Sequence, residues 1–283
     1  MSDTPHCYRH PGRETLVSCS ECGRPICEEC MTFAPVGIKC PEHAGVRAAR
    51  PVQRAARPAR QAHRTVAGLD APATIALVVL NVLVYLITVY QGAGVSAPGG
   101  RVFDDGALVG ASIYADGDWY RLLTSMFLHA SLLHLAFNML ALYWLGSIVE
   151  QALGTWRYLL LYFVSGIAGA AGALLFSSPF AVTVGASGAI FGVMGALLVL
   201  EYRATGSFTG PALGLIAINL ALSFAIPNIS WGGHLGGLVG GVLATFALVH
   251  FQYARSRSLG PVLVGLIMVA SLVVAYVRVE SYV

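Results

Sequence analysis

Seven long apolar stretches follow a polar N-terminal part of the chain. They cover residues 71–90, 131–149, 157–176, 187–202, 211–226, 231–250 and 261–279. Several of them approach the roughly 20 residues that an α-helix needs to cross the hydrocarbon layer of a bilayer. The pattern therefore predicts an all-α polytopic membrane protein with seven spans.

Glycines recur at helical spacing in two of these stretches. In the fourth stretch Gly188 and Gly192 are four residues apart, and in the sixth the glycines lie at 232, 236 and 240 and at 233, 237 and 241. Small residues at this spacing let two helix backbones approach closely inside a membrane. We therefore expect the helices at 187–202 and 231–250 to pack tightly against each other.

The composition agrees with a membrane protein. Of the 283 residues 56% are hydrophobic and 11% are charged, and the mean hydropathy is +0.70, whereas an ordinary soluble domain has about 25% charged residues. The charges are concentrated at the start, because residues 1–70 hold 10 of the 17 Lys and Arg and 7 of the 14 Asp and Glu. Residues 1–20 lack a continuous apolar core, so we expect no signal peptide there.

A basic linker precedes the first apolar stretch. Residues 46–69 contain no acidic residue and carry six arginines, at positions 47, 50, 54, 57, 60 and 64. Basic residues beside a first span hold that end in the cytoplasm and can contact anionic lipid headgroups. With seven spans, the C-terminus is then expected outside the cell membrane. This placement accounts for the charge, so we expect no nucleic-acid partner.

The N-terminal residues contain four pairs of metal-ligand side chains. The pairs are Cys7/His10, Cys19/Cys22, Cys27/Cys30 and Cys40/His43. A gap of two residues lets both members reach one tetrahedral ion, so eight ligands predict two structural Zn²⁺ ions. His6, beside Cys7, is a candidate to replace one of these ligands. All six cysteines precede position 41, which favours a reducing, cytoplasmic location for this module.

The four pairs can be shared between two ions in two main ways. Sequential sharing joins the first pair to the second, whereas interleaved sharing joins the first to the third and the second to the fourth. We favour the interleaved form, because only four residues separate Cys22 from Cys27 and crossing lets both metals brace one small core. The stretch resembles a B-box zinc finger, and we expect it to dock a cytoplasmic protein partner or to regulate the chain.

Four polar side chains lie at one predicted depth of the membrane part. Ser187 opens the fourth stretch, and His234 lies in the first turn of the sixth, and both stretches begin at the outer face. His134 and Asn138 begin the second stretch, four residues apart and so on one helix face. Packing poorly explains such a convergence from three helices.

These residue types provide the parts of nucleophilic catalysis. Ser187 can act as nucleophile with His234 as its general base, and Gly185 leaves the hydroxyl reachable. His134 and Asn138 can donate hydrogen bonds to an oxyanion, together with the backbone N–H of Ser187. Phe191 lies four residues after the serine, on the face that can support the imidazole ring.

Other catalytic groups are missing from the apolar part of the sequence. Between positions 151 and 279 the single carboxylate is Glu201, about 21 Å from Ser187 at a helical rise of about 1.5 Å per residue. This predicts a Ser–His dyad without a third member. No Cys follows position 40, no Asp follows position 118 and there is no His-Glu-x-x-His, which excludes thiol, paired-aspartate and zinc-water hydrolysis.

Five motifs together carry a family resemblance. They are Gly185-x-Ser187-Gly188, Gly233-His234-x-x-Gly237, His134-x3-Asn138, Gly146-x3-Glu150-x3-Gly154 and Trp119-Tyr120-Arg121. With them, residues 71–250 resemble the rhomboid family of intramembrane serine proteases. The resemblance implies a six-helix core around a water-filled cavity open to the outside, here with a seventh C-terminal transmembrane helix. It also implies cleavage of transmembrane protein substrates near their outer end, with the substrate entering beside residues 211–226. The resemblance further implies small residues before the scissile bond and no cofactor for proteolysis.

Two positions depart from the family pattern, and two alternatives follow. The family often has Trp-Arg in place of Tyr120-Arg121 and Tyr in place of Phe191, and both departures keep an aromatic ring.

One alternative function is that of a rhomboid-like pseudoprotease that binds or escorts membrane proteins, but such proteins generally lack the serine or the histidine. The other is a transporter, which would need charged or broken helices at mid-membrane.

The sequence thus predicts four regions. A zinc-binding module covers 1–45, the basic linker covers 46–69 and the rhomboid-like protease core covers 70–252. A cytoplasmic loop and the seventh transmembrane helix cover 253–283.

Overall fold

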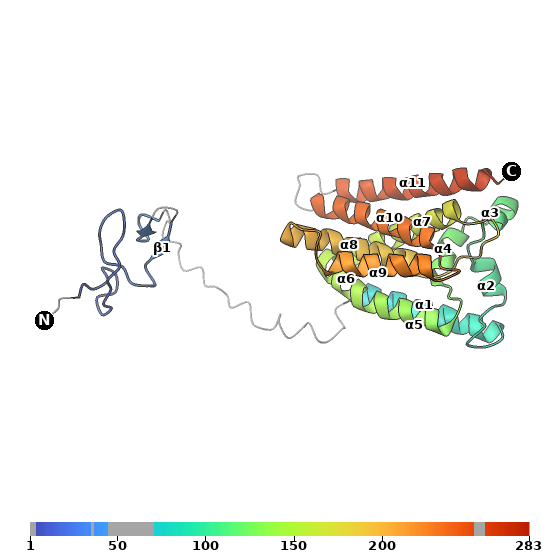
Figure 1. Cartoon of the computed structure of the whole chain (residues 1–283), viewed down its shortest axis with the longest axis horizontal. Helices are drawn as coiled ribbons and strands as arrows, with labels where there is room; N and C mark the ends of the chain where they lie inside the picture. Colours follow the sequence, from blue (N-terminus) through green and yellow to red (C-terminus); the bar gives the residue numbers. More distant parts are fainter. Residues whose placement is uncertain (1–3, 35–36, 45–70, 252–257, 283) are drawn as a thin grey trace. The chain divides into compact units, whose positions relative to one another are not determined.

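The computed structural model describes residues 4–34, 37–44, 71–251 and 258–282 (Figure 1). The chain divides into two compact units, Met1–Val66 and Ala67–Val283, which are considered separately. The predicted basic linker at 46–69, with its six arginines, lies outside the described residues. So do residues 252–257, in the region that was expected to begin with a cytoplasmic loop.

The N-terminal unit has little regular structure. Strands β1 (Thr32–Phe33) and β2 (Ile38–Lys39) pair antiparallel, with Thr32 opposite Lys39. Its interior consists of five buried cysteines and Ile26, with partly buried apolar side chains around them. So small an apolar core cannot stabilise a fold of this size without further cross-links.

The second unit is a helical bundle. Its long helices are α1 (Pro72–Gln91), α7 (Thr155–Phe176), α8 (Ser187–Thr205), α9 (Pro211–Ala225), α10 (Trp231–His250) and α11 (Leu259–Glu280). The second apolar stretch forms α5 (Leu132–Ala141), the π-helical segment η3 (Leu142–Gly146) and α6 (Ser147–Leu153) in direct succession. In the described part of the chain, six helices are long and apolar enough to cross a membrane, counting 132–153 as one, and α9 is a shorter apolar helix. All seven apolar stretches are therefore helical, and the protein is all-α and polytopic.

The π-helical turn interrupts a stretch that was predicted to be a regular helix. Gly146 ends this turn, and a Cβ atom there would lie 2.5 Å from the Tyr158 hydroxyl and 3.1 Å from Thr74. The absence of a side chain at Gly146 therefore lets the second span lie against α1 and α7 at one point.

Glu150 on α6 joins three helices. Its carboxylate oxygens accept hydrogen bonds from the backbone N–H of Ala73 (3.1 Å) and Thr74 (2.8 Å), and from the hydroxyls of Thr74 (2.8 Å) and Thr155 (2.9 Å). The first N–H groups of a helix have no partner within the helix and attract negative charge. Glu150, which is buried, thus caps α1 from a neighbouring helix.

Glycines bring α7, α8 and α10 into backbone contact. A Cβ atom on Gly237 would lie 1.9 Å from the Gly188 carbonyl oxygen, and one on Gly241 would lie 2.3 Å from Cα of Gly192. A Cβ atom on Gly172 of α7 would similarly lie 2.3 Å from the Gly232 carbonyl oxygen. The predicted close approach of the fourth and sixth apolar stretches is confirmed.

The long segment between α1 and α5 contains four short helices. They are α2 (Arg101–Gly106), α3 (Gly110–Asp116), α4 (Arg121–Thr124) and the 3₁₀ turn η2 (Ser125–Phe127). Arg121 is buried, donates to the carbonyls of Asp104 (2.7 Å) and Ala107 (2.9 Å), and pairs with Asp118 at 2.9 Å. One guanidinium therefore holds α2 and α4 together.

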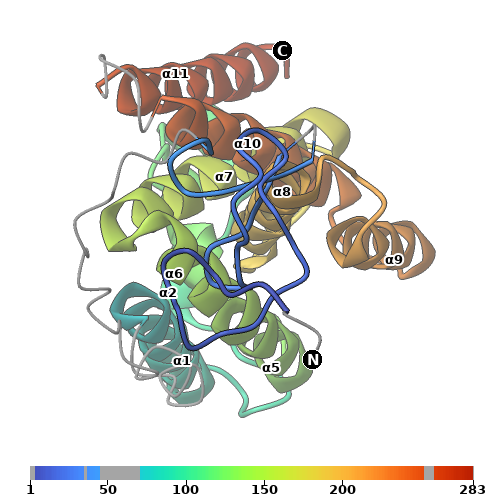
Figure 2. The same cartoon turned by 90° about the vertical axis from the view of Figure 1, so that its left-hand side faces the viewer.

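Helices α9 and α11 lie at the edges of the bundle (Figure 2). Of the 15 residues of α9, only Ile216 and Ser223 are buried. The carboxylate of Glu201 accepts a hydrogen bond from the backbone N–H of Ala212 at 3.0 Å. Glu201 therefore supports the start of α9, at the opposite end of α8 from Ser187.

Candidate active site and metal-binding groups

Ser187 is the first residue of α8, and the segment before it is held on two sides. Leu108 and Thr183 form an isolated antiparallel bridge, with N–H to O distances of 3.0 and 2.9 Å, and the N–H of Gly185 donates to the carbonyl of Ser125 at 2.9 Å. Gly185 has a φ of 127°, which favours glycine. The segment between α7 and α8 thus presents the serine from a fixed backbone.

His234 lies in the first turn of α10, where Ser230 caps the helix by accepting from the N–H of Gly233 at 3.2 Å. Its imidazole is buried, and Nε2 lies 2.8 Å from Oγ of Ser187. The structure therefore brings together the two residues that the sequence assigned to a dyad. Helices α8 and α10 meet where Gly188 contacts Gly237. Gly188 directly follows Ser187, and Gly237 lies three residues after His234.

The imidazole of His234 has a neighbour on its face and another at its second nitrogen. The ring of Phe191 is stacked on it, with centroids 4.2 Å apart and an interplanar angle of 16°. The hydroxyl of Ser223, on α9, lies 2.6 Å from Nδ1 of His234. The partner of this nitrogen is thus a hydroxyl from another helix and not a carboxylate.

His134 and Asn138 lie on one face of α5, as expected. Gly185 is next to the His134 ring, since a Cβ atom on this glycine would lie 2.8 Å from Nε2 of His134 and 3.7 Å from the Ser187 hydroxyl. Asn138 is buried, and its side-chain amide donates to the His134 carbonyl at 2.9 Å. His134 thus lies beside the serine segment, whereas the side-chain amide of Asn138 bonds within α5.

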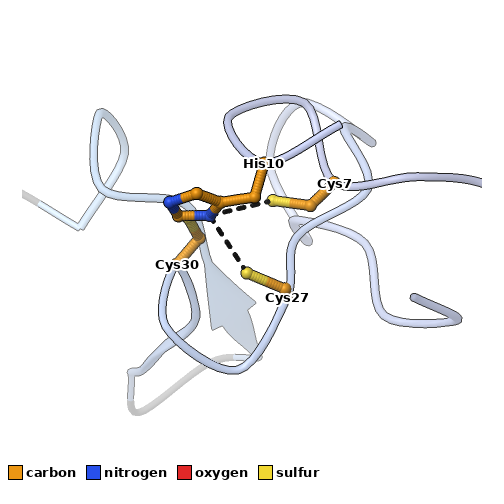
Figure 3. A group of neighbouring side chains, drawn as sticks. All are labelled: Cys7, His10, Cys27 and Cys30. Atoms are coloured by element: carbon orange, nitrogen blue, oxygen red, sulfur yellow. Dashed lines mark hydrogen bonds between the residues drawn. The ribbon is translucent and has the colours of Figure 1, made fainter. Parts of the chain in front are cut away.

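Four ligand atoms gather at each of two places in the N-terminal unit. Each set lies within 4.8 Å and contains three thiols and one imidazole; the first set is Cys7, His10, Cys27 and Cys30, and the second is Cys19, Cys22, Cys40 and His43. The first set comes from two separate loops, with the imidazole directed at the sulfur atoms (Figure 3). This is the interleaved grouping of the four pairs, and His6 belongs to neither set.

The distances within both sets fit a tetrahedral metal ion. In the first, Nδ1 of His10 lies 3.9, 3.3 and 3.4 Å from the sulfur atoms of Cys7, Cys27 and Cys30. In the second, the sulfur atoms of Cys22 and Cys40 are 3.8 Å apart. Two thiolates on one zinc are expected about 3.8 Å apart, given tetrahedral Zn–S bonds of about 2.3 Å. Each set could therefore hold one metal ion.

Two of these thiols are easily ionised. Burial raises the pKa of Cys7, but hydrogen bonds with the backbone of Cys27, Arg9 and His10 lower it to about 6. Burial likewise raises the pKa of Cys19, and the backbone of Cys40, Cys22 and Glu21 lowers it to about 6. Each set thus contains one cysteine whose pKa is lowered, which favours the thiolate, the metal-binding form.

The bundle of long apolar helices, with a serine and a histidine paired inside it, defines a polytopic membrane protein. A family model for the rhomboid domain matches residues 116–251. The rhomboid protease GluP of Bacillus subtilis is 40% identical over 169 residues, which are 58% of this chain and 32% of GluP. The rhomboid homologue YdcA of the same bacterium is 38% identical over 150 residues, or 50% of this chain and 73% of YdcA.

A plant relative gives the same result. RHOMBOID-like protein 7 of Arabidopsis thaliana is 36% identical over 155 residues, or 52% of this chain and 49% of that protein. The chain therefore spans about a third of GluP and about half of this plant protein. The chain belongs to the rhomboid family.

Proposed function

We propose that the chain is an intramembrane serine endopeptidase that cleaves transmembrane segments of membrane proteins near their outer end. The observation that carries this proposal is the 2.8 Å contact between Oγ of Ser187 and Nε2 of His234 inside a bundle of apolar helices. Membership of the rhomboid family supports it, because the relative GluP is itself described as a rhomboid protease.

In the proposed reaction Ser187 attacks the carbonyl carbon of the scissile peptide bond. Nε2 of His234 takes the serine proton and then gives it to the departing amine, which leaves an acyl-enzyme. A water molecule next loses a proton to His234 and attacks the ester, and the proton returns to the serine oxygen as the new C-terminus leaves. The reaction needs no cofactor.

The negative oxygen formed in each half of this reaction requires hydrogen-bond donors. Ser187 is the first residue of α8, so its N–H has no partner within the helix and lies at the positive end of the helix dipole. His134 lies beside Gly185 and can supply a second donor. Asn138 can supply a third, since its amide has two N–H bonds and one is used within α5.

Activity of the full-length protein in liposomes tests this proposal. Ser187→Ala and His234→Ala should each abolish cleavage of a helical membrane substrate, and Ser187→Ala should abolish labelling by a fluorophosphonate. His250→Ala, at the other end of α10, should cleave normally. Normal turnover by either dyad variant would refute the mechanism. An unreactive but substrate-binding wild type would instead support the pseudoprotease alternative.

We further propose that the N-terminal unit binds two structural Zn²⁺ ions, one in each Cys/His set. Three thiolates with one imidazole are a common closed, structural zinc site. The module supplies nothing that the dyad needs, so we propose that it docks a cytoplasmic protein or regulates the protease.

The proposed topology places the N-terminus in the cytoplasm and the C-terminus outside the cell membrane. Seven helical spans put the two ends on opposite faces, provided that the 15-residue helix α9 counts as a span. A reporter fused after Val283 should be located outside the cell membrane. A reporter located inside would mean that one of the seven helices does not span the membrane. We also propose the four regions given by the sequence, which are the zinc-binding module (1–45), the linker (46–69), the protease core (70–252) and the C-terminal region (253–283). Because the dyad belongs to the protease core, deletion of residues 1–45 should leave proteolysis in detergent intact.

A further inference from the structure

The hydroxyl of Ser223 lies between two groups that can both bind it. It donates to the carbonyl of Asn219, one turn earlier on α9, at 2.7 Å, and it lies 2.6 Å from Nδ1 of His234. Ser223 is 3% exposed and His234 is 9% exposed, so water does not compete freely for these contacts.

The protons of this contact can be assigned by counting donors. A serine hydroxyl carries one proton, and a carbonyl oxygen can only accept. The hydroxyl keeps both contacts only if it donates to the Asn219 carbonyl and accepts from His234. In that arrangement Nδ1 of His234 carries a proton, and the neutral imidazole has its lone pair on Nε2. This lone pair faces the hydroxyl of Ser187 at 2.8 Å.

We propose that Ser223 is a positioning residue that fixes the tautomer and orientation of His234 in place of a carboxylate. The inference rests on the proposed function, since it explains how the dyad base is held ready to accept a proton. Removal of the acceptor would leave a buried N–H without a partner. It would also allow the opposite tautomer, in which Nε2–H donates to Ser187 and cannot take its proton.

The same contact connects the dyad to the most exposed helix beside it. Only Ile216 and Ser223 are buried along α9, and Ser223 is the one whose side chain bonds to another helix. Any displacement of α9 from α10 therefore removes the acceptor from Nδ1. The competent tautomer of His234 thus depends on the position of α9.

The test uses the full-length protein and two separate readouts. The first is the rate at which a fluorophosphonate labels Ser187, together with kcat and KM for a helical substrate. Ser223→Ala should lower the labelling rate and kcat about 10- to 100-fold with KM unchanged, because a buried partner is lost. Ser223→Thr keeps the hydroxyl and should stay within a few fold of the wild type. The control is Ser271→Ala on α11, whose hydroxyl also donates one turn back, to Ile267 at 2.8 Å, and which should change nothing.

The second readout does not depend on activity. In protein labelled with ¹⁵N-histidine, the His234 signals are identified by their loss in His234→Gln. They should show Nδ1 protonated in the wild type and a mixture of tautomers in Ser223→Ala. The proposal would be overturned by a proton on Nε2 in the wild type, or by a Ser223→Ala variant that the fluorophosphonate labels at the wild-type rate. Equal losses in the Ala and Thr variants with Nδ1 still protonated would assign Ser223 to packing. Failure of the wild type to be labelled at Ser187 would instead count against the proposed function.

Discussion

Phe191 lies flat against His234, with the two ring centroids 4.2 Å apart and the planes inclined by 16°. Phe191 is one turn along α8 from Ser187, so the helix that carries Ser187 also supplies the ring on which the His234 imidazole rests. With Ser223 at Nδ1 and Ser187 at Nε2, the imidazole has a neighbour on its face and at both nitrogens. No carboxylate takes part in these contacts.

Replacement of Phe191 should affect kcat according to whether the aromatic ring is kept. Phe191→Tyr should retain wild-type kcat, whereas Phe191→Ala should lower it about 2- to 10-fold, because an aromatic pair contributes about 0.5–1.5 kcal/mol. Phe246→Ala is the matched control, since Phe246 stacks on His250 at the far end of α10. Steady-state cleavage in liposomes measures all three. Full activity of Phe191→Ala would remove the stacking from the mechanism.

The two polar residues of α5 should contribute less than the dyad. His134→Ala and Asn138→Ala should each retain measurable cleavage, because loss of one oxyanion donor typically lowers the rate by about 10²–10³. Single-turnover assays at high enzyme concentration can detect such residual rates. If both variants were as inactive as Ser187→Ala, a structural role would replace the proposed donor role.

Gly237 should tolerate no side chain. Its Cβ atom would lie 1.9 Å from the Gly188 carbonyl oxygen, and backbone atoms cannot rotate away as a flexible side chain can. We expect Gly237→Ala to cost about 1–3 kcal/mol or more in stability and to separate Ser187 from His234. Gly265→Ala on α11 is the control, because nothing lies within 4 Å of the added atom. Thermal unfolding in detergent and fluorophosphonate labelling should both distinguish the two variants.

Metal analysis of the full-length protein should give two equivalents of zinc. Cys27→Ser, in the first Cys/His set, should reduce the content to one equivalent. A chelator should unfold the N-terminal unit if bound metals, as proposed, supply much of its folding energy. His6→Ala should keep both ions, since His6 is outside both sets although it is next to Cys7. A content of one in the wild type would contradict the two-site proposal.

The sequence predicted the helices and the Ser187–His234 pair because both depend on local patterns. The apolar stretches gave the spans, and glycine spacing on the two helices required an approach that puts their first turns together. The Cys/His grouping followed from the short segment between Cys22 and Cys27 in the same way. The four regions of the chain and the catalytic roles stay predictions.

Two features could not be predicted, because they depend on how helices turn toward one another. Ser223 reaches Nδ1 of His234 only through the rotation of α9 about its own axis, and an apolar stretch with few polar residues does not define that rotation. The spacing of Asn219 and Ser223, one turn apart in an apolar stretch, was the available signal. The π-helical turn ending at Gly146 likewise depends on the Tyr158 side chain of another helix.

The glycine contacts between α8 and α10 also affect how the protein adapts to membranes of different hydrocarbon thickness. Helices in backbone contact tilt together when the hydrocarbon layer thickens, so the distance from Ser187 to His234 should not depend on lipid chain length. Helix α9 is different: its 15 residues extend about 22 Å, against a hydrocarbon thickness of about 30 Å. If α9 spans the membrane as proposed, the mismatch between lipid and protein falls on α9, and with it on the contact between His234 and Ser223.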